Sequence, residues 1–385
     1  MKYVPCLPVF ILASSLFSCQ QKVGPIANPA DYKPYLNLSV NKSLRACEDE
    51  MAFWNNRLKK NKEDEVSILK LAGLHASRFQ LNGKVEDLKA SDSLYMDILH
   101  DTPFGKSEIY QSLAANSITQ HKFRQAREYI QQALAIGDSK DGSLLMMVDI
   151  NLELGDYAGA KNILKQFVNR NSFAYLIRKA KMKDHQGDLD SAIVLMEKAV
   201  DRIHENKSLF TWTKSNLADM YGHAGRVKEA YQSYLEVLER DPNYDYALKG
   251  IAWIALSNDH NTTEAKQIMQ FLSTKKELPD MHLLLAEIAR FEGNEEEKKR
   301  ELQLFTEKAQ RPQYLNMYDK YLVLLEAEDL TNPSRAIEIA MKEVLNRPTP
   351  QSYDLLAWSY YSKGELKKAI EVAQQNVVRY LCDFF

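Results

Sequence analysis

A short pattern of residues recurs along most of this chain, and this recurrence limits its fold more than any other feature. The clearest copy reads Leu217-Ala218-x-x-Tyr221-x-x-x-Gly225-x-x-x-x-Ala230-x-x-x-Tyr234-x-x-Val237-x-x-x-x-Pro242, and another reads Leu356-Ala357-x-x-Tyr360-x-x-x-Gly364-x-x-x-x-Ala369. A unit of this length cannot bury its apolar face alone and must stack on its neighbours. The chain is therefore predicted to be an array of similar units.

A small residue after each turn sets the register of the array. The positions are Ala126, Ala160, Ala192, Ala230, Ala265, Lys298, Ala336 and Ala369, spaced 32 to 38 residues apart, and Lys298 departs from the pattern because it is not small. Spacing that varies around one value is typical of stacked repeats with loop insertions. The alternative is a single helical domain in which these alanines and glycines fall by chance. Strands are not expected, because no sustained period-two alternation of apolar and polar residues occurs.

The pattern resembles the tetratricopeptide repeat, whose period is about 34 residues. The resemblance implies an all-α, right-handed superhelical array of antiparallel helix pairs, an α-solenoid, with about 8–9 repeats over residues 67–380. It places Ala218 and Ala230 where two helices cross, with Tyr221 and Tyr234 filling the space beside them. Glycine adopts φ > 0 without strain, so Gly225 is expected to end the first helix. Pro242 is expected to stop the second, since proline cannot continue a helix.

The first residues have the pattern of a targeting segment. Residues 1–18 contain Lys2, an apolar run and then Ser18-Cys19, and this resembles a bacterial lipoprotein signal in which Cys19 is acylated. Residues 19–37 contain Gly24, Pro25, Pro29 and Pro34 and are interpreted as a flexible tether. The alternatives are a secretory signal cut elsewhere or a short membrane anchor, although the apolar run is shorter than a spanning helix needs. Residues 38–66 are predicted to form an N-terminal capping helix.

Composition and motifs argue against catalysis. The formal net charge of −2 and the pI near 6.5 give no basic patch for nucleic acid. No metal-binding spacing, phosphate loop or nucleophile elbow occurs, and the histidines are scattered singly. We therefore expect neither a cofactor nor a metal, and we expect that the protein is not an enzyme.

The resemblance implies that a partner binds on the concave face of the array, which the first helix of each repeat lines. Carried over position by position, the lining residues are Lys181, Asp184, His185, Asp219, Gly222, His223, Trp358, Tyr361 and Ser362. For Trp358, packing between repeats is an equal alternative. The predicted function is a lipid-anchored scaffold of the bacterial cell envelope, on the periplasmic side or the outer membrane, that binds a protein or extended peptide. The alternative is a surface lipoprotein that binds a glycan or nutrient.

The chain finishes on an irregular apolar tail, residues 381–385, which keeps no repeat pattern. Terminal units of such arrays need a polar outer face. We therefore expect the tail to fold back on the preceding repeat, to dock on a partner, or to lead into further repeats. An exposed patch of this kind predicts self-association.

Overall fold

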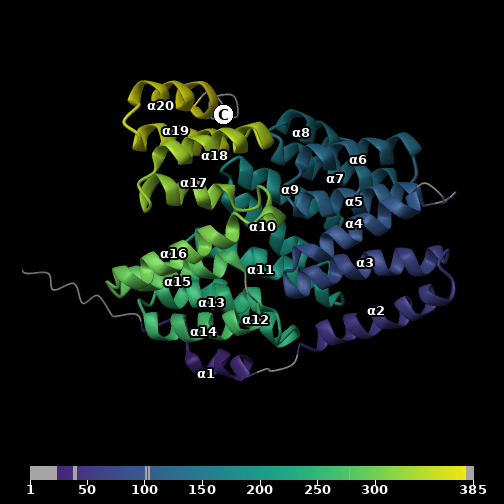
Figure 1. Ribbon diagram of the computed structural model, residues 1–385, viewed down its shortest axis with the longest axis horizontal. Helices are drawn as coiled ribbons and strands as arrows, with labels where there is room; N and C mark the ends of the chain where they lie inside the picture. The colour runs from purple at the N-terminus through teal and green to yellow at the C-terminus, as the bar shows by residue number, and fades with distance from the viewer. Residues whose placement is uncertain (1–23, 38–40, 100–101, 103–104, 277, 379–385) are drawn as a thin grey trace, which may run out of the picture.

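The computed structural model describes residues 24–37, 41–99, 102, 105–276 and 278–378, and within these ranges every regular element is helical (Figure 1). The helices are α1 Pro29–Tyr32, α2 Lys42–Lys60, α3 Glu65–Asn82, α4 Val85–Leu99, α5 Lys106–Thr119, α6 Phe123–Ile136, α7 Lys140–Glu153, α8 Tyr157–Lys165, α9 Phe173–His185, α10 Leu189–Val200, α11 Lys207–His223, α12 Val227–Arg240, α13 Asp245–Ser257, α14 Thr262–Lys275, α15 Pro279–Phe291, α16 Glu295–Ala309, α17 Asp319–Glu328, α18 Pro333–Asn346, α19 Pro350–Ser362 and α20 Leu366–Ala373. Short helical turns η1 Lys33–Asn37, η2 Pro312–Tyr314 and η3 Gln374–Val378 complete the set. From α3 to α20 the helices pair in succession along the chain. The prediction of an all-α solenoid of helix pairs is confirmed.

Local sequence signals set the helix boundaries. Asparagine side chains begin several helices, as at Asn206, whose side chain accepts a hydrogen bond from the Leu209 amide at 3.0 Å. Gly225 follows the last turn of α11 with φ of +72°, which is the left-handed conformation that glycine adopts most readily. At His260 a non-glycine residue takes this conformation between α13 and α14.

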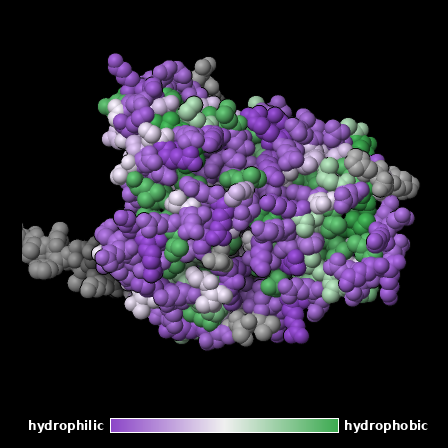
Figure 2. Space-filling view, in the orientation of Figure 1, coloured by the Kyte–Doolittle hydropathy of each residue, from purple (hydrophilic) through white to green (hydrophobic). Residues whose placement is uncertain are grey.

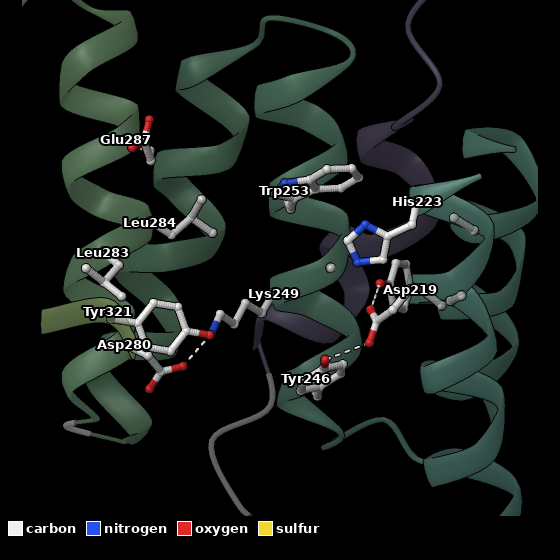
Figure 3. Close-up of a pocket in the computed structure, with 15 residues that line it drawn as sticks. Asp219, His223, Tyr246, Lys249, Trp253, Asp280, Leu283, Leu284, Glu287 and Tyr321 are labelled. Carbon is white, nitrogen blue, oxygen red and sulfur yellow. Dashed lines mark hydrogen bonds and ion pairs between the residues drawn. The ribbon is translucent and has the colours of Figure 1, made fainter. Parts of the chain in front are cut away.

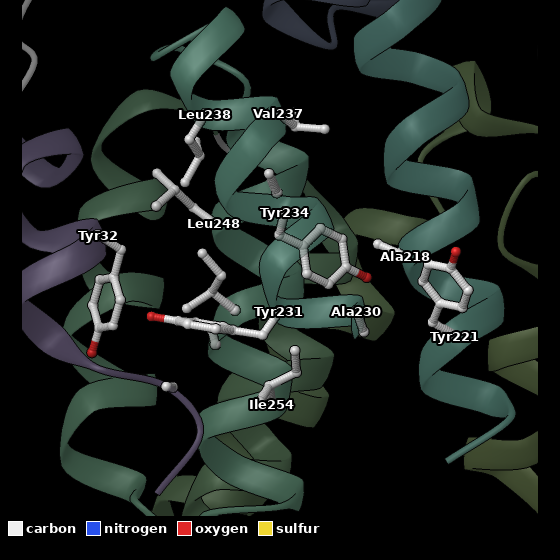
Figure 4. Close-up of a cluster of buried hydrophobic side chains, with 14 of the residues drawn as sticks. Tyr32, Ala218, Tyr221, Ala230, Tyr231, Tyr234, Val237, Leu238, Leu248 and Ile254 are labelled. Atoms are coloured by element: carbon white, nitrogen blue, oxygen red, sulfur yellow. The ribbon is translucent and has the colours of Figure 1, made fainter. Parts of the chain in front are cut away.

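The small residues of the repeat lie where the paired helices cross. Ala126, Ala160, Ala192 and Ala230 are almost completely buried, and at such positions only a small side chain lets helix axes approach closely. In the central core, Tyr231 and Tyr234 of α12 point to opposite sides of the helix (Figure 4). Tyr234 packs against Gly250 of α13, where a Cβ atom would lie only 2.3 Å from the ring.

The interpretation of residues 19–37 as a flexible tether is wrong for residues 24–37. In this segment the amides of Ile26 and Ala27 donate to the carboxylate of Asp259 at 2.9 and 2.8 Å. Tyr32 of α1 is completely buried and its hydroxyl donates to Glu264 at 2.6 Å. These contacts show that the segment packs along α12 and α14. It can do so because side chains distant in sequence pair with backbone groups that no regular helix or strand satisfies. We name residues 26–36 the N-terminal strap.

The array closes on itself instead of remaining an open arc. The end of α18 lies beside the turns around α6 and α8 (Figure 1). Asn346 donates to the His121 carbonyl at 3.0 Å, and Arg347 forms an ion pair with Glu153 at 2.5 Å. A Cβ atom on Gly155 would lie 2.5 Å from the Pro348 carbonyl oxygen. This closure brings segments about two hundred residues apart in sequence into contact.

The surface in the view of Figure 2 is mainly hydrophilic, and hydrophobic residues gather near the side where α3 to α5 lie. Among the described residues, no helix combines the length and apolarity needed to cross a membrane. The predicted signal and Cys19, and the tail at 381–385, lie outside the described residues. Those predictions therefore stay predictions.

Candidate binding site

A cavity of about 460 Å³ lies on the inner side of the array between successive first helices of the repeats. Helices α11, α13 and α15 supply most of its walls, and α17 contributes Tyr321 (Figure 3). Each of these helices presents one side to the interior of the solenoid, so neighbouring repeats build the cavity together. We call it the inner pocket.

Exposed aromatic and half-buried aliphatic side chains form the apolar part of the inner pocket. Trp253 remains 42% exposed although it lies in the middle of α13, and Tyr321 is 43% exposed. Leu283 and Leu284 face them from α15 (Figure 3). Large rings left open to solvent are a common feature of surfaces that bind a partner, because they gain buried area when it docks.

A clasp of tyrosines around Asp219 forms one polar edge of the inner pocket. Tyr234 donates a hydrogen bond to one carboxylate oxygen of Asp219, and Tyr246 donates to the other at 2.7 Å. Burial raises the pKa of Asp219, and the two donated hydrogen bonds act against that rise. His223 lies close to this carboxylate, one turn further along α11 (Figure 3). The clasp ties three helices together and fixes the shape of this wall.

A charged pair forms the second polar edge. Lys249 of α13 is ion-paired with Asp280 of α15 (Figure 3). Glu287 lies two turns further along α15 and also lines the inner pocket. The lining acids therefore outnumber the lining lysines, which favours a partner segment that carries positive charge beside an apolar side chain.

The structure separates the predicted lining residues into three places. Asp219, Gly222 and His223 line the inner pocket. Lys181 instead pairs with Glu153 at 2.8 Å near the closure, and His185 packs beside Tyr157 with its ring centroid 5.6 Å away.

Asp184 on the same helix is exposed. Trp358 and Tyr361 stack on each other on α19, with centroids 5.3 Å apart, and both remain exposed, as Ser362 does in part. The predicted residues therefore do not form one continuous lining.

The ionic groups at the closure are strongly perturbed. Burial alone would raise the pKa of Glu153, but the Lys181 and Arg347 cations lower it to about 2. Burial lowers the pKa of His185, and its Nδ1 atom is buried without a hydrogen-bond partner in the described structure. The closure is therefore sensitive to the loss of any one of these groups, since removing one partner of a buried pair leaves an uncompensated charge.

Residues of α13 and α15 also line the inner pocket, notably Trp253, Lys249 and Leu284, and none of them is among the predicted lining residues. The turn between α13 and α14 contains no glycine, so the repeat pattern does not mark the lining positions of α13. Pro242 could have predicted the lining positions of α13, because α13 begins just after it and the start of a helix fixes which residues share one face. Within the described part of the chain, no group of three or more potential metal ligands occurs.

Comparisons with known proteins agree with this architecture. Two models described as tetratricopeptide repeat match residues 143–172 and 214–244. The protein described as "Cellulose synthase 1 operon protein C" of Komagataeibacter xylinus is 27% identical over 154 residues, 40% of this chain. The matched stretch is only 10% of that protein's length.

Solved structures resemble the chain over longer stretches. A monomeric mutant of IFIT1 with Gppp-AAAA has a TM-score of 0.51 at 14% identity, and the match covers 86% of this chain and 76% of that one. A tetratricopeptide repeat protein from Parabacteroides merdae is 20% identical, with 63% and 98% covered and a TM-score of 0.36. At 14% identity, the likeness to IFIT1 shows a common fold only. Together with the helix pairs described above, the two repeat models show that this chain is an all-α solenoid containing tetratricopeptide repeats.

Proposed function

We propose that this protein is a non-catalytic scaffold that holds an extended segment of a partner protein in the inner pocket. The observation that carries the proposal is the set of partly exposed rings, Trp253, Tyr246 and Tyr321, gathered from α13 and α17 around one cavity. Proteins of this repeat class commonly bind protein or peptide partners. An apolar side chain of the segment would enter between Trp253 and Leu284, where it would lose the most contact with water.

The polar groups of the inner pocket define the rest of the expected segment. Glu287 and the Asp219 clasp lie on either side of the apolar walls, and Lys249 is already neutralised by Asp280. A Lys or Arg next to the apolar side chain would complement these carboxylates. We therefore expect the recognised segment to carry an aromatic or large aliphatic residue close to a basic one.

Peptide display tests this proposal directly. Selection of a random peptide library on the wild type should enrich an apolar residue adjacent to Lys or Arg, and Trp253→Ala should lose that enrichment. Trp358→Ala is the matched control, because Trp358 is exposed to a similar extent but lies on α19, outside the inner pocket. Equal enrichment on the wild type and on Trp253→Ala would refute the proposal.

We further propose that the scaffold is extracytoplasmic and is anchored in the bacterial cell envelope through lipid on Cys19. The sequence Leu16-Phe17-Ser18-Cys19 after an apolar run supports this. The chain between Cys19 and Ile26 can span at most about 25 Å. Since Ile26 begins the N-terminal strap, an anchor at Cys19 would hold the outer side of α12 and α14 close to the membrane.

Membrane fractionation tests the anchor. Cys19→Ala should move the protein from the membrane fraction to the soluble fraction, because stable anchoring requires the acyl chains. Cys47→Ala is the control, since Cys47 is buried in the fold. Full membrane retention of Cys19→Ala would exclude lipidation at this residue without bearing on the inner pocket.

A further inference from the structure

A second cavity, of about 800 Å³, lies between the first helices of the chain and the middle of the array. The start of α2 and the end of α3 form one side, and the first turns of α11, α13 and α15 form the other. Tyr246, Lys249 and Asp280 separate it from the inner pocket, since they line both cavities. We call it the polar cavity. Its size falls within the range of about 300–1,000 Å³ found for small-molecule sites.

The lysines of the polar cavity are all neutralised by carboxylates that also line it. Lys207 pairs with Asp241 at 3.3 Å, and Lys276 pairs with Asp245 at 3.1 Å. Lys249 pairs with Asp280 in the wall shared with the inner pocket. A phosphate or carboxylate ligand would have to compete with these acids for a cation, and a cationic ligand would have to displace a lysine. The charge pattern therefore favours an uncharged ligand.

Neutral hydrogen-bonding groups, aromatic rings and three apolar side chains, Leu81, Leu278 and Met281, make up the rest of the lining. Hydroxyl and amide side chains come from both sides of the polar cavity, from Ser43, Ser77 and Gln80 on one and from Ser208 and Asn243 on the other. The Oδ1 atom of Asn243 is buried and has no hydrogen-bond partner in the described structure. Buried polar atoms in native proteins almost always have a partner. This oxygen is thus available to accept a hydrogen bond from a bound molecule.

Two aromatic side chains stand beside these polar groups. Trp212 of α11 is 45% exposed and Tyr246 of α13 is 49% exposed, and both line the polar cavity. Partly exposed rings with hydroxyl and amide groups at their edges match a ligand that has an apolar face and many hydroxyl groups around it. A pyranose ring has this character, since its C–H groups form a face and its hydroxyls project from the edge.

We propose that the polar cavity binds a neutral oligosaccharide, with a sugar ring stacked on Trp212 and a hydroxyl donating to Asn243. An extended peptide fits less well, because most of the lining side chains carry hydroxyl, amide or ion-paired groups and few would cover its apolar side chains. A nucleic acid fits less well still, because no lysine of the cavity is free to contact phosphate. This site is separate in chemistry from the inner pocket, and the protein would hold a glycan and a protein segment side by side.

A glycan array decides the proposal. The detergent-solubilised full chain is applied to an array of neutral oligosaccharides, including cellotetraose, maltotetraose and chitotetraose, together with uronic-acid and sialylated glycans. Binding to one or more neutral glycans and to no acidic glycan is expected. Binding to none of the neutral glycans, or preference for acidic ones, would overturn the proposal.

Variants then place the glycan in the cavity. Titration calorimetry with the neutral glycan bound by the wild type should show affinity weakened at least about tenfold in Trp212→Ala, and partly restored in Trp212→Phe. Trp253→Ala and Trp358→Ala are controls that should leave glycan affinity unchanged, because neither residue lines the polar cavity. The Trp253→Ala control also separates this site from the inner pocket. Unchanged affinity in Trp212→Ala would show that the glycan binds elsewhere.

Discussion

Replacing Gly250 by alanine should destabilise the protein, although this change normally stabilises a helix. Gly250 lies in the middle of α13, where alanine is more favourable than glycine by about 1 kcal/mol. A Cβ atom here would lie 2.3 Å from Cζ of Tyr234 and 2.6 Å from two other ring atoms. The ring would have to move by about 1 Å to reach ordinary contact distance. It cannot do so freely, because it is buried and its hydroxyl is bonded to Asp219.

The cost of overpacking a well-packed core is about 1–3 kcal/mol. Because the new Cβ atom would contact the fixed ring of Tyr234, the overpacking cost of Gly250→Ala should lie near the upper end of that range. After subtraction of the gain in helix propensity, the free energy of unfolding should fall by about 1–2 kcal/mol. Gly73→Ala in the middle of α3 is the matched control. A Cβ atom there would meet only the Tyr95 hydroxyl at 3.6 Å, an ordinary contact, so this variant should gain up to about 1 kcal/mol.

Urea unfolding of the two variants, followed by circular dichroism, measures the difference in free energy of unfolding. We expect the midpoint to fall for Gly250→Ala and to hold or rise for Gly73→Ala. Gly250→Ala should also weaken peptide binding at the inner pocket, because Tyr234 holds Asp219. Midpoints that move in the same direction would refute the packing argument.

Three other perturbations test separate features. Ala230→Leu should lower the free energy of unfolding by about 1–3 kcal/mol through overpacking of the crossing between α11 and α12, and an unchanged melting curve would contradict the register. Burial raises the pKa of Glu343 to about 7. Between about pH 4.5 and 7 the folded state therefore keeps a proton on Glu343 that the unfolded state has lost. The contribution of Glu343 to the free energy of unfolding falls as the pH rises through this range. Glu343→Gln should flatten this slope in urea titrations at several pH values, and an unaltered slope would exclude Glu343 as its source. Removal of residues 378–385 should reduce self-association of the soluble form in sedimentation at high concentration, and a monomeric full-length protein would contradict a role for the tail.

The repeat pattern predicted the helix pairs because its signals are local. The turn at Gly225 and the small residue at Ala230 act within one repeat, and each is visible in a short stretch of sequence. Interactions of this kind lie only a few residues apart, so period and composition are enough to find them.

Contacts between segments distant in sequence could not be predicted from local sequence signals. The strap residues Ile26 and Ala27 have no periodicity, and the carboxylate that receives their amides belongs to Asp259, more than two hundred residues away. The ion pair between Arg347 and Glu153 likewise joins two turns that no local rule relates. Two of the nine predicted lining residues, Lys181 and His185, lie beside the closure for this reason and not in a groove.

The closure changes how the binding sites should respond to damage. In an open solenoid each repeat contacts only its neighbours, so a perturbation weakens along the array. In this protein the N-terminal strap packs against α12 and α14, and the ion pair between Arg347 and Glu153 joins the last repeats to α7. The helices that build the inner pocket and the polar cavity therefore lie between two long-range connections, which limit how far the array can open. The polar cavity depends most on that restraint, because packing between adjacent repeats does not by itself hold α2 and α3 against α11, α13 and α15.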